Sequence, residues 1–142
     1  MTPPVPPVLL VEDDPNHAMI FAHAWKRAGR RPTLETVSDG DQAVAFLACE
    51  GAFQERARDV VPTRVILDLK LPRRSGLDVL AWIREQPRLR ALPVSILTSS
   101  EETSDRTRAE ALGVEGFHVK PVGLAELVQL IQRIEPLGIQ GR

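Results

Sequence analysis

Charged side chains that could do chemistry together follow short apolar runs at widely separated points of the chain: Glu12, Asp13, Asp68 and Lys120. Three carboxylates brought close together repel one another, so a cation must accompany them. An all-oxygen set with a lysine beside it suits a hard divalent cation such as Mg²⁺, which keeps several waters and is completed by a phosphate. A carboxylate in that setting can act as a nucleophile toward phosphorus and form an aspartyl-phosphate.

Two further residues fit phosphoryl chemistry. Lys120 is one of only three lysines, whereas the chain has fifteen arginines. Arginine is thus the common cationic residue of this chain, and a lysine at position 120 indicates a specific need. A compact ammonium can sit against both a carboxylate and a phosphate, which a planar guanidinium does less well. Thr98 ends another apolar run and offers a hydroxyl to a phosphoryl group.

The spacing of apolar residues predicts the elements that position these side chains. Strands are expected at residues 8–11, 33–38, 64–69, 93–98 and 116–120. Helices are expected at residues 15–29, 41–50, 76–86, from a cap at Ser104 or Asp105 to Gly113, and at 123–135. Strands alternating with helices predict an α/β fold whose parallel sheet carries helices on both faces. Function in such folds collects at the carboxyl ends of the strands, where the charged residues converge.

Length and composition exclude several classes of protein. A chain of 142 residues with 43% hydrophobic and 26% charged residues is typical of one globular domain. We expect a Pro-rich lead-in at 1–7, a domain at 8–135 and a tail at 136–142. A net charge of −1 gives no excess of positive charge that would attract nucleic acid directly. The apolar runs are too short to cross a membrane. The lone Cys49 and the absence of a signal peptide predict a cytoplasmic location.

Four motifs in order resemble the signature of response-regulator receiver domains of two-component signalling, which are CheY-like. The matching segments are Val11-Glu12-Asp13-Asp14, Asp68-Leu69-Lys70-Leu71-Pro72 with Gly76, Thr98-Ser99 and Lys120-Pro121. The resemblance covers about residues 8–135 and implies a flavodoxin-like sheet in the order 2-1-3-4-5. The Pro-rich start, the long connection at 51–63 and the segment from Leu71 to Leu80 are similar to single-domain regulators paired with bacterial phytochromes.

The resemblance implies a phosphoryl acceptor and a metal site. Asp68 would accept a phosphoryl group from a sensor histidine kinase in a phosphorelay, the kinase being a bacteriophytochrome if the narrower likeness holds. Glu12, Asp13, Asp68 and the backbone carbonyl of Lys70 would hold Mg²⁺. The protein would catalyse only its own phosphoryl transfer and autodephosphorylation, so it would not be an enzyme in the usual sense.

The resemblance also implies a switch. Thr98 and Lys120 would grip the phosphate, Phe117 would move with Thr98, and the bond before Pro121 would be cis. The fourth helix, fifth strand and fifth helix would then change their contacts with other proteins. The apolar stripe on the last helix favours a homodimer through this face.

Other interpretations remain for the same residues. The acids at 12–14 would suit a helix N-terminus even without chemistry. A magnesium-dependent phosphohydrolase is a second function, but it would usually need an acid at position 70, where this chain has lysine. A phosphorylation-independent adaptor is a third, and the complete residue set argues against it. The histidines, His17, His23 and His118, form no ligand set in the sequence, so structural or surface roles are expected for them.

Overall fold

The computed structural model describes residues 6–30, 32–57, 60–99 and 102–134, and it confirms the predicted architecture. Five parallel strands form one sheet in the order β2-β1-β3-β4-β5. The strands are β1 (Val8–Val11), β2 (Leu34–Val37), β3 (Arg64–Leu67), β4 (Val94–Thr98) and β5 (Gly116–Val119). The reversal of strand order beside β1 creates the crevice at which such folds place their sites.

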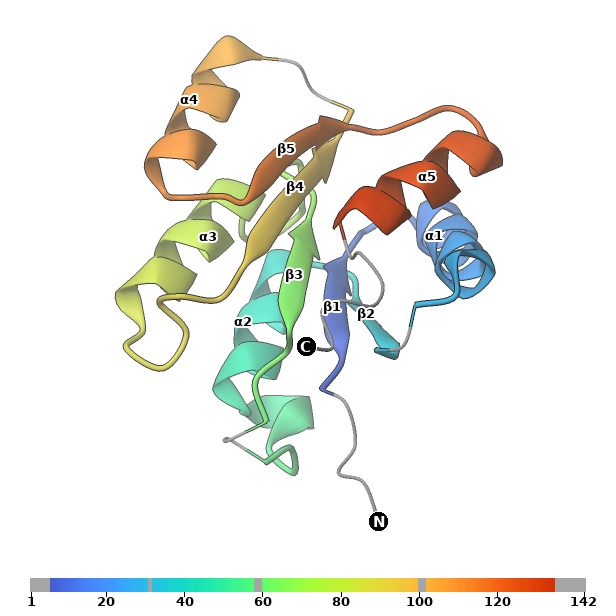
Figure 1. Cartoon of the computed structure of the whole chain (residues 1–142). Coiled ribbons are helices and arrows are strands. Elements are labelled where there is room, and N and C mark those ends of the chain that lie inside the picture. Colours follow the sequence, from blue (N-terminus) through green and yellow to red (C-terminus); the bar gives the residue numbers. More distant parts are fainter. Residues whose placement is uncertain (1–5, 31, 58–59, 100–101, 135–142) are drawn as a thin grey trace.

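Helices cover both faces of this sheet (Figure 1). They are α1 (Pro15–Ala28), α2 (Gly40–Ala48), α3 (Gly76–Glu85), α4 (Thr103–Ala111) and α5 (Leu124–Ile134). Figure 1 shows α1 and α5 side by side on one face, with α2, α3 and α4 on the other. Within the described ranges, none of the helices is long and apolar enough to cross a bilayer.

Alternating side chains of the central strands build two separate halves of the core. Leu9, Val65 and Ile96 face α2 and α3, whereas Leu10 and Ile66 face α1 and α5. All five are buried. Continuous apolar strands are therefore needed, because a parallel sheet covered on both faces has no solvent side.

Side-chain caps begin two of the helices beside the site. The Asp14 side chain accepts a hydrogen bond from the Asn16 N–H, and Ser75 caps α3 by accepting from the Asp78 N–H. Helix α1 is capped at its C-terminus by Gly29, whose φ of 71° is a left-handed conformation that glycine adopts without strain. These caps fix where α1 and α3 start, directly after the strand ends that carry the charged residues.

The cap predicted for the fourth helix is wrong. The cap residue is Glu102, and the expected caps, Ser104 and Asp105, lie inside the first turn of α4. The Asp105 carboxylate faces Lys70 across the loop instead. Of the nine residues of α4, all of which the structure describes, only Ala109 is buried, so this helix is lightly anchored.

Other differences from the sequence prediction are small. The third strand ends at Leu67 rather than residue 69, because the Asp68 carboxylate accepts a hydrogen bond from the Lys70 N–H and begins a turn. The connection at 51–63 contains a short 3-10 turn, η1 (Gly51–Phe53), anchored by an edge-on contact with Phe46. The tail at 136–142, and all of the lead-in except Pro6 and Pro7, lie outside the described residues.

Candidate functional site

The register of the sheet brings the charged residues to one edge. Val11 of β1 pairs with Leu67 of β3, so the next residue of each strand, Glu12 and Asp68, stand side by side. In the same way Thr98 ends β4 opposite the last residue of β5, after which comes Lys120. Sequence reasoning had predicted this convergence, because the carboxyl ends of parallel strands share an edge.

The acidic side chains lie close enough to hold one cation. Glu12, Asp13 and Asp68 each offer a carboxylate oxygen, and these oxygens lie within 4.8 Å of one another. Glu12 and Asp68 are each 6% exposed, whereas Asp13 is open to solvent. Buried hard oxygens with one exposed neighbour fit a divalent ion that keeps part of its water shell.

Lys120 places its ammonium between the two buried acids. Its Nζ lies 2.8 Å from Glu12 Oε1 and 2.9 Å from Asp68 Oδ2. Burial lowers the pKa of Lys120, but hydrogen bonds to Glu12 and Asp68 and their negative charges outweigh it, so the pKa lies above its ordinary value. The ammonium is therefore charged at neutral pH and offsets the repulsion between the carboxylates.

The backbone beside Asp68 is shaped by a glycine. The Lys70 N–H donates to Asp68 Oδ1 at 3.2 Å, and the Gly76 N–H donates to the Leu69 carbonyl. A Cβ at position 76 would collide with the backbone of Asp68 and Leu69. Glycine is required there because the start of α3 packs directly against the turn that carries the Asp68 carboxylate.

The Lys70 side chain points away from the acidic cluster. Its Nζ lies 3.0 Å from Glu102 Oε1 and 3.5 Å from Asp105 Oδ2, at the start of α4. The hydrogen bond that Lys70 donates to Glu102, and the negative charges of Glu102 and Asp105, raise the pKa of Lys70. The Lys70 ammonium is therefore paired with the start of α4 and not with Asp68.

Thr98 and Phe117 lie on neighbouring strands. Thr98 is fully buried, and its carbonyl accepts a hydrogen bond from the Lys120 N–H. Phe117 is half-buried on β5, and the Arg106 guanidinium of α4 lies 5.4 Å from its ring centre. The switch residues implied by the resemblance thus connect the acidic edge to α4.

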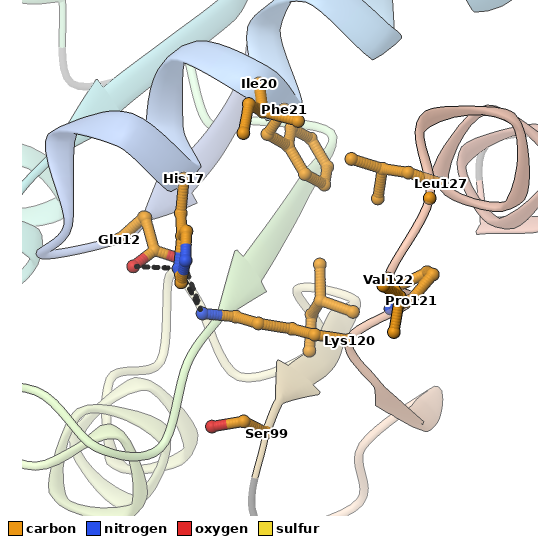
Figure 2. A pocket seen from close by; sticks show the side chains of 11 residues that line it. Glu12, His17, Ile20, Phe21, Ser99, Lys120, Pro121, Val122 and Leu127 are labelled. Carbon is orange, nitrogen blue, oxygen red and sulfur yellow. Dashed lines mark hydrogen bonds and ion pairs between the residues drawn. The ribbon is translucent and has the colours of Figure 1, made fainter.

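Sequence reasoning missed His17. Its Nδ1 lies 3.4 Å from Lys120 Nζ, and Figure 2 shows the ring between Glu12 and Lys120. The same residues border a cavity of about 320 Å³ whose apolar lining includes Phe21 and Leu127. One feature of the sequence could have identified His17. It lies in the first turn of α1, the helix that directly follows the acidic residues at the end of β1.

The profile of the response regulator receiver domain matches residues 8–132. The chain belongs to this family. Phosphorylation on an aspartate is typical of receiver domains, and the acidic cluster fits their usual divalent-metal site. Receiver domains are signalling modules rather than enzymes of metabolism.

Curated relatives include regulators from distant organisms. The receiver domain is 35% identical over 128 residues to the probable methanogenesis regulatory protein FilR2 of Methanothrix harundinacea, covering 90% of this chain and 80% of the relative. It is 32% identical over 133 residues to response regulator Rcp1 of Synechocystis sp., covering 94% and 88%.

Solved structures point to regulators associated with phytochromes. The bacteriophytochrome response regulator RtBRR superposes with a TM-score of 0.81 at 40% identity, covering 95% of this chain and 79% of that one. The Mn²⁺-bound form of Rcp1 gives 0.83 at 30% identity, covering 96% of each. The likeness to phytochrome response regulators expected from the sequence is confirmed. The Lys120–Pro121 bond is trans, contrary to expectation, and nothing in the structure explains the difference.

Proposed function

We propose that Asp68 accepts a phosphoryl group from a sensor histidine kinase. The observation that carries this proposal is the Lys120 ammonium, held within 2.9 Å of both buried acids. A carboxylate oxygen of Asp68 forms the new bond to phosphorus while the bond to the donor imidazole nitrogen breaks, and the electron pair stays on that nitrogen. Lys120 then has a phosphoryl oxygen to pair with beside Asp68.

The cation proposed for this site is Mg²⁺. Glu12, Asp13 and Asp68 would hold it with their carboxylates, and Lys70 with its backbone carbonyl. When bound, Mg²⁺ supplies positive charge that offsets the charge on the transferring phosphoryl oxygens. All the donors are hard oxygens, which suits Mg²⁺ better than a thiolate-seeking metal.

Phosphorylation is proposed to switch the surface made by α4, β5 and α5. The Thr98 hydroxyl moves toward the phosphoryl group, and Phe117 takes the space it leaves. Because α4 buries only Ala109, a small inward movement of Phe117 is enough to shift the helix. The two states then present different surfaces to other proteins.

A second copy of the chain is one proposed partner for this surface, which we call the α4–β5–α5 face. Val119 is 45% exposed on it. Val119, Glu126 and Arg133 all line one surface pocket. In a two-fold contact between copies, Glu126 of one copy can therefore face Arg133 of the other. The kinase is proposed to be a bacteriophytochrome, in keeping with the relatives. We further propose a cytoplasmic receiver domain at 8–135 that makes no direct nucleic-acid contact.

The phosphoryl acceptor is tested with a small phosphodonor. The protein is incubated with acetyl phosphate and Mg²⁺, and phosphorylation is followed by intact-protein mass spectrometry. The wild type and Asp78→Asn, which changes an exposed acid at the start of α3, should both gain one phosphoryl group. Asp68→Asn should gain none, and labelling of that variant at the wild-type rate would refute the proposal.

The homodimer is tested by light scattering before and after phosphorylation. Val119→Glu should leave the chain folded and prevent association, because it places a carboxylate at an exposed position of the α4–β5–α5 face. If the phosphorylated wild type stays monomeric at micromolar concentration, the dimer is wrong and another protein must cover this face.

A further inference from the structure

His17 joins the acidic edge to the first turn of α1. Its Nδ1 lies 3.4 Å from Lys120 Nζ, and its Nε2 lies 3.6 Å from Asp14 Oδ2. The side chain is 53% exposed, yet Figure 2 shows the ring directed at the Lys120 ammonium. The contact joins residues 103 positions apart, so the fold and not local sequence creates it.

The His17 ring has polar neighbours on both of its nitrogens. Nδ1 lies 3.4 Å from Lys120 Nζ and 3.9 Å from Glu12 Oε2, and Nε2 lies 3.6 Å from Asp14 Oδ2. When Nδ1 carries no proton, it can accept a hydrogen bond from the ammonium, which only donates. These neighbours together favour one orientation of the ring.

Asp14 is itself held in place. Its Oδ1 accepts the Asn16 N–H at 2.9 Å as the cap of α1, which leaves Oδ2 turned toward His17. The hydrogen bond of the cap thus orients Asp14, and Asp14 in turn orients the His17 ring, which contacts Lys120. A carboxylate behind a histidine that meets a reactive group is a common way to fix the direction of an imidazole.

His17 completes the set of acceptors around Lys120. The ammonium has three N–H donors, and these face Glu12 Oε1, Asp68 Oδ2 and His17 Nδ1. The ammonium stands at the end of a flexible four-carbon side chain. Each acceptor that is lost therefore widens the range of positions that the ammonium can adopt. The third acceptor belongs to an exposed side chain of α1, and its Nδ1 also lies 3.9 Å from Glu12 Oε2.

We propose that Asp14 and His17 form a positioning pair that aims the Lys120 ammonium at the incoming phosphoryl group. Neither residue touches the reacting atoms. The proposal rests on the phosphorylation of Asp68 for its effect on rate, but not for the contact itself. It assigns a role to a histidine for which the sequence alone favoured a structural or surface role.

The first test compares two replacements of His17. Asparagine keeps an acceptor oxygen near the position of Nδ1, whereas alanine removes it. His17→Ala should lower the maximal rate of labelling by acetyl phosphate about threefold to tenfold, because one long, half-exposed hydrogen bond is lost. The donor concentration at half-maximal rate should not change, since the loss falls on the transition state. His17→Asn should stay within about twofold of the wild type.

Two controls accompany these variants. His23→Ala removes another exposed histidine from α1 and should label at the wild-type rate. Asp14→Asn keeps a side-chain oxygen that can cap α1 but loses the charge facing His17, so it should slow labelling about twofold. Equal rates for His17→Ala and the wild type, or equal slowing by alanine and asparagine, would overturn the positioning role.

A second readout needs neither metal nor phosphodonor. With only three lysines in the chain, the ¹³Cε signal of Lys120 can be resolved by NMR in lysine-labelled protein. His17→Ala should move this signal, whereas His17→Asn and His23→Ala should not. A wild type that takes up no phosphoryl group would refute the proposed function, while an unmoved Lys120 signal in His17→Ala would refute the positioning pair.

Discussion

Lys120 Nζ lies 2.9 Å from Asp68 Oδ2, although the two residues are 52 positions apart in the chain. They meet because β3 and β5 flank β4 and all three strands end at the same edge. Asp68 is 6% exposed, and a buried charge without a partner would cost several kcal/mol. The ion pair between Lys120 and Asp68 therefore stabilises the strand ends. It also keeps the Lys120 ammonium beside the carboxylate that is proposed to react.

Replacing Lys120 with arginine should keep the positive charge but greatly slow the phosphorylation of Asp68. A planar guanidinium cannot sit between Glu12 and Asp68 and also meet a phosphoryl oxygen as a compact ammonium does. We expect the labelling rate with acetyl phosphate to fall by about a hundredfold or more. Lys26→Arg, on the exposed side of α1, is the control and should label normally. A Lys120→Arg rate within threefold of the wild type would contradict the role of Lys120.

Removing one carboxylate from the acidic cluster should weaken metal binding. Asp13→Asn takes away the exposed acid and leaves both buried ones in place. We expect the Kd for Mg²⁺ measured by calorimetry to rise on the order of tenfold. Asp78→Asn serves as the control and should bind Mg²⁺ as the wild type does. Unchanged affinity in Asp13→Asn would mean that the cation binds elsewhere.

His118 should make the protein less stable in mild acid. Burial lowers its pKa below the ordinary value, and the charges of Arg133 and Arg106 lower it further. Between the folded-state pKa and the unfolded value of about 6.5, the unfolded chain binds more protons than the folded one. The free energy of unfolding should therefore decrease as the pH falls below about 6.5, and this contribution should be fully present above it.

Urea unfolding at neutral and mildly acidic pH measures this effect. His118→Gln should show a smaller loss of stability on acidification than the wild type. Arg133→Gln removes one of the two nearby cations and should also reduce the loss, but less completely, because burial remains. If His118→Gln and the wild type lose the same stability, the half-buried imidazole of His118 does not contribute.

The sequence predicted most of the site because each element ends in a distinctive residue. Continuous apolar runs identified β1, β3 and β4 as central strands, and their polar last or next residues marked the functional edge. Asp68 was identifiable because an acid at the end of a buried strand needs a partner. The elements and their succession along the chain were therefore predictable from the residues, whereas the order of the strands in the sheet was expected only from the resemblance to receiver domains.

Side-chain direction was not readable in the same way. The sequence gives no sign that Lys70 turns toward Glu102, or that Asp105 faces Lys70 instead of capping α4. Both depend on how the β3–α3 loop sits against α4, which is a tertiary contact. His17 was missed for a related reason, because its partner Lys120 comes from the other end of the chain.

The most direct test of the account is the location of the phosphoryl group in the wild-type chain. The protein is phosphorylated with acetyl phosphate and Mg²⁺, digested at low temperature, and its peptides are sequenced by mass spectrometry. We predict one modified position, Asp68. A phosphoryl group on Asp13 or His17 instead, or on no residue at all, would contradict the central claim that the paired Lys120 and acidic cluster make Asp68 the acceptor.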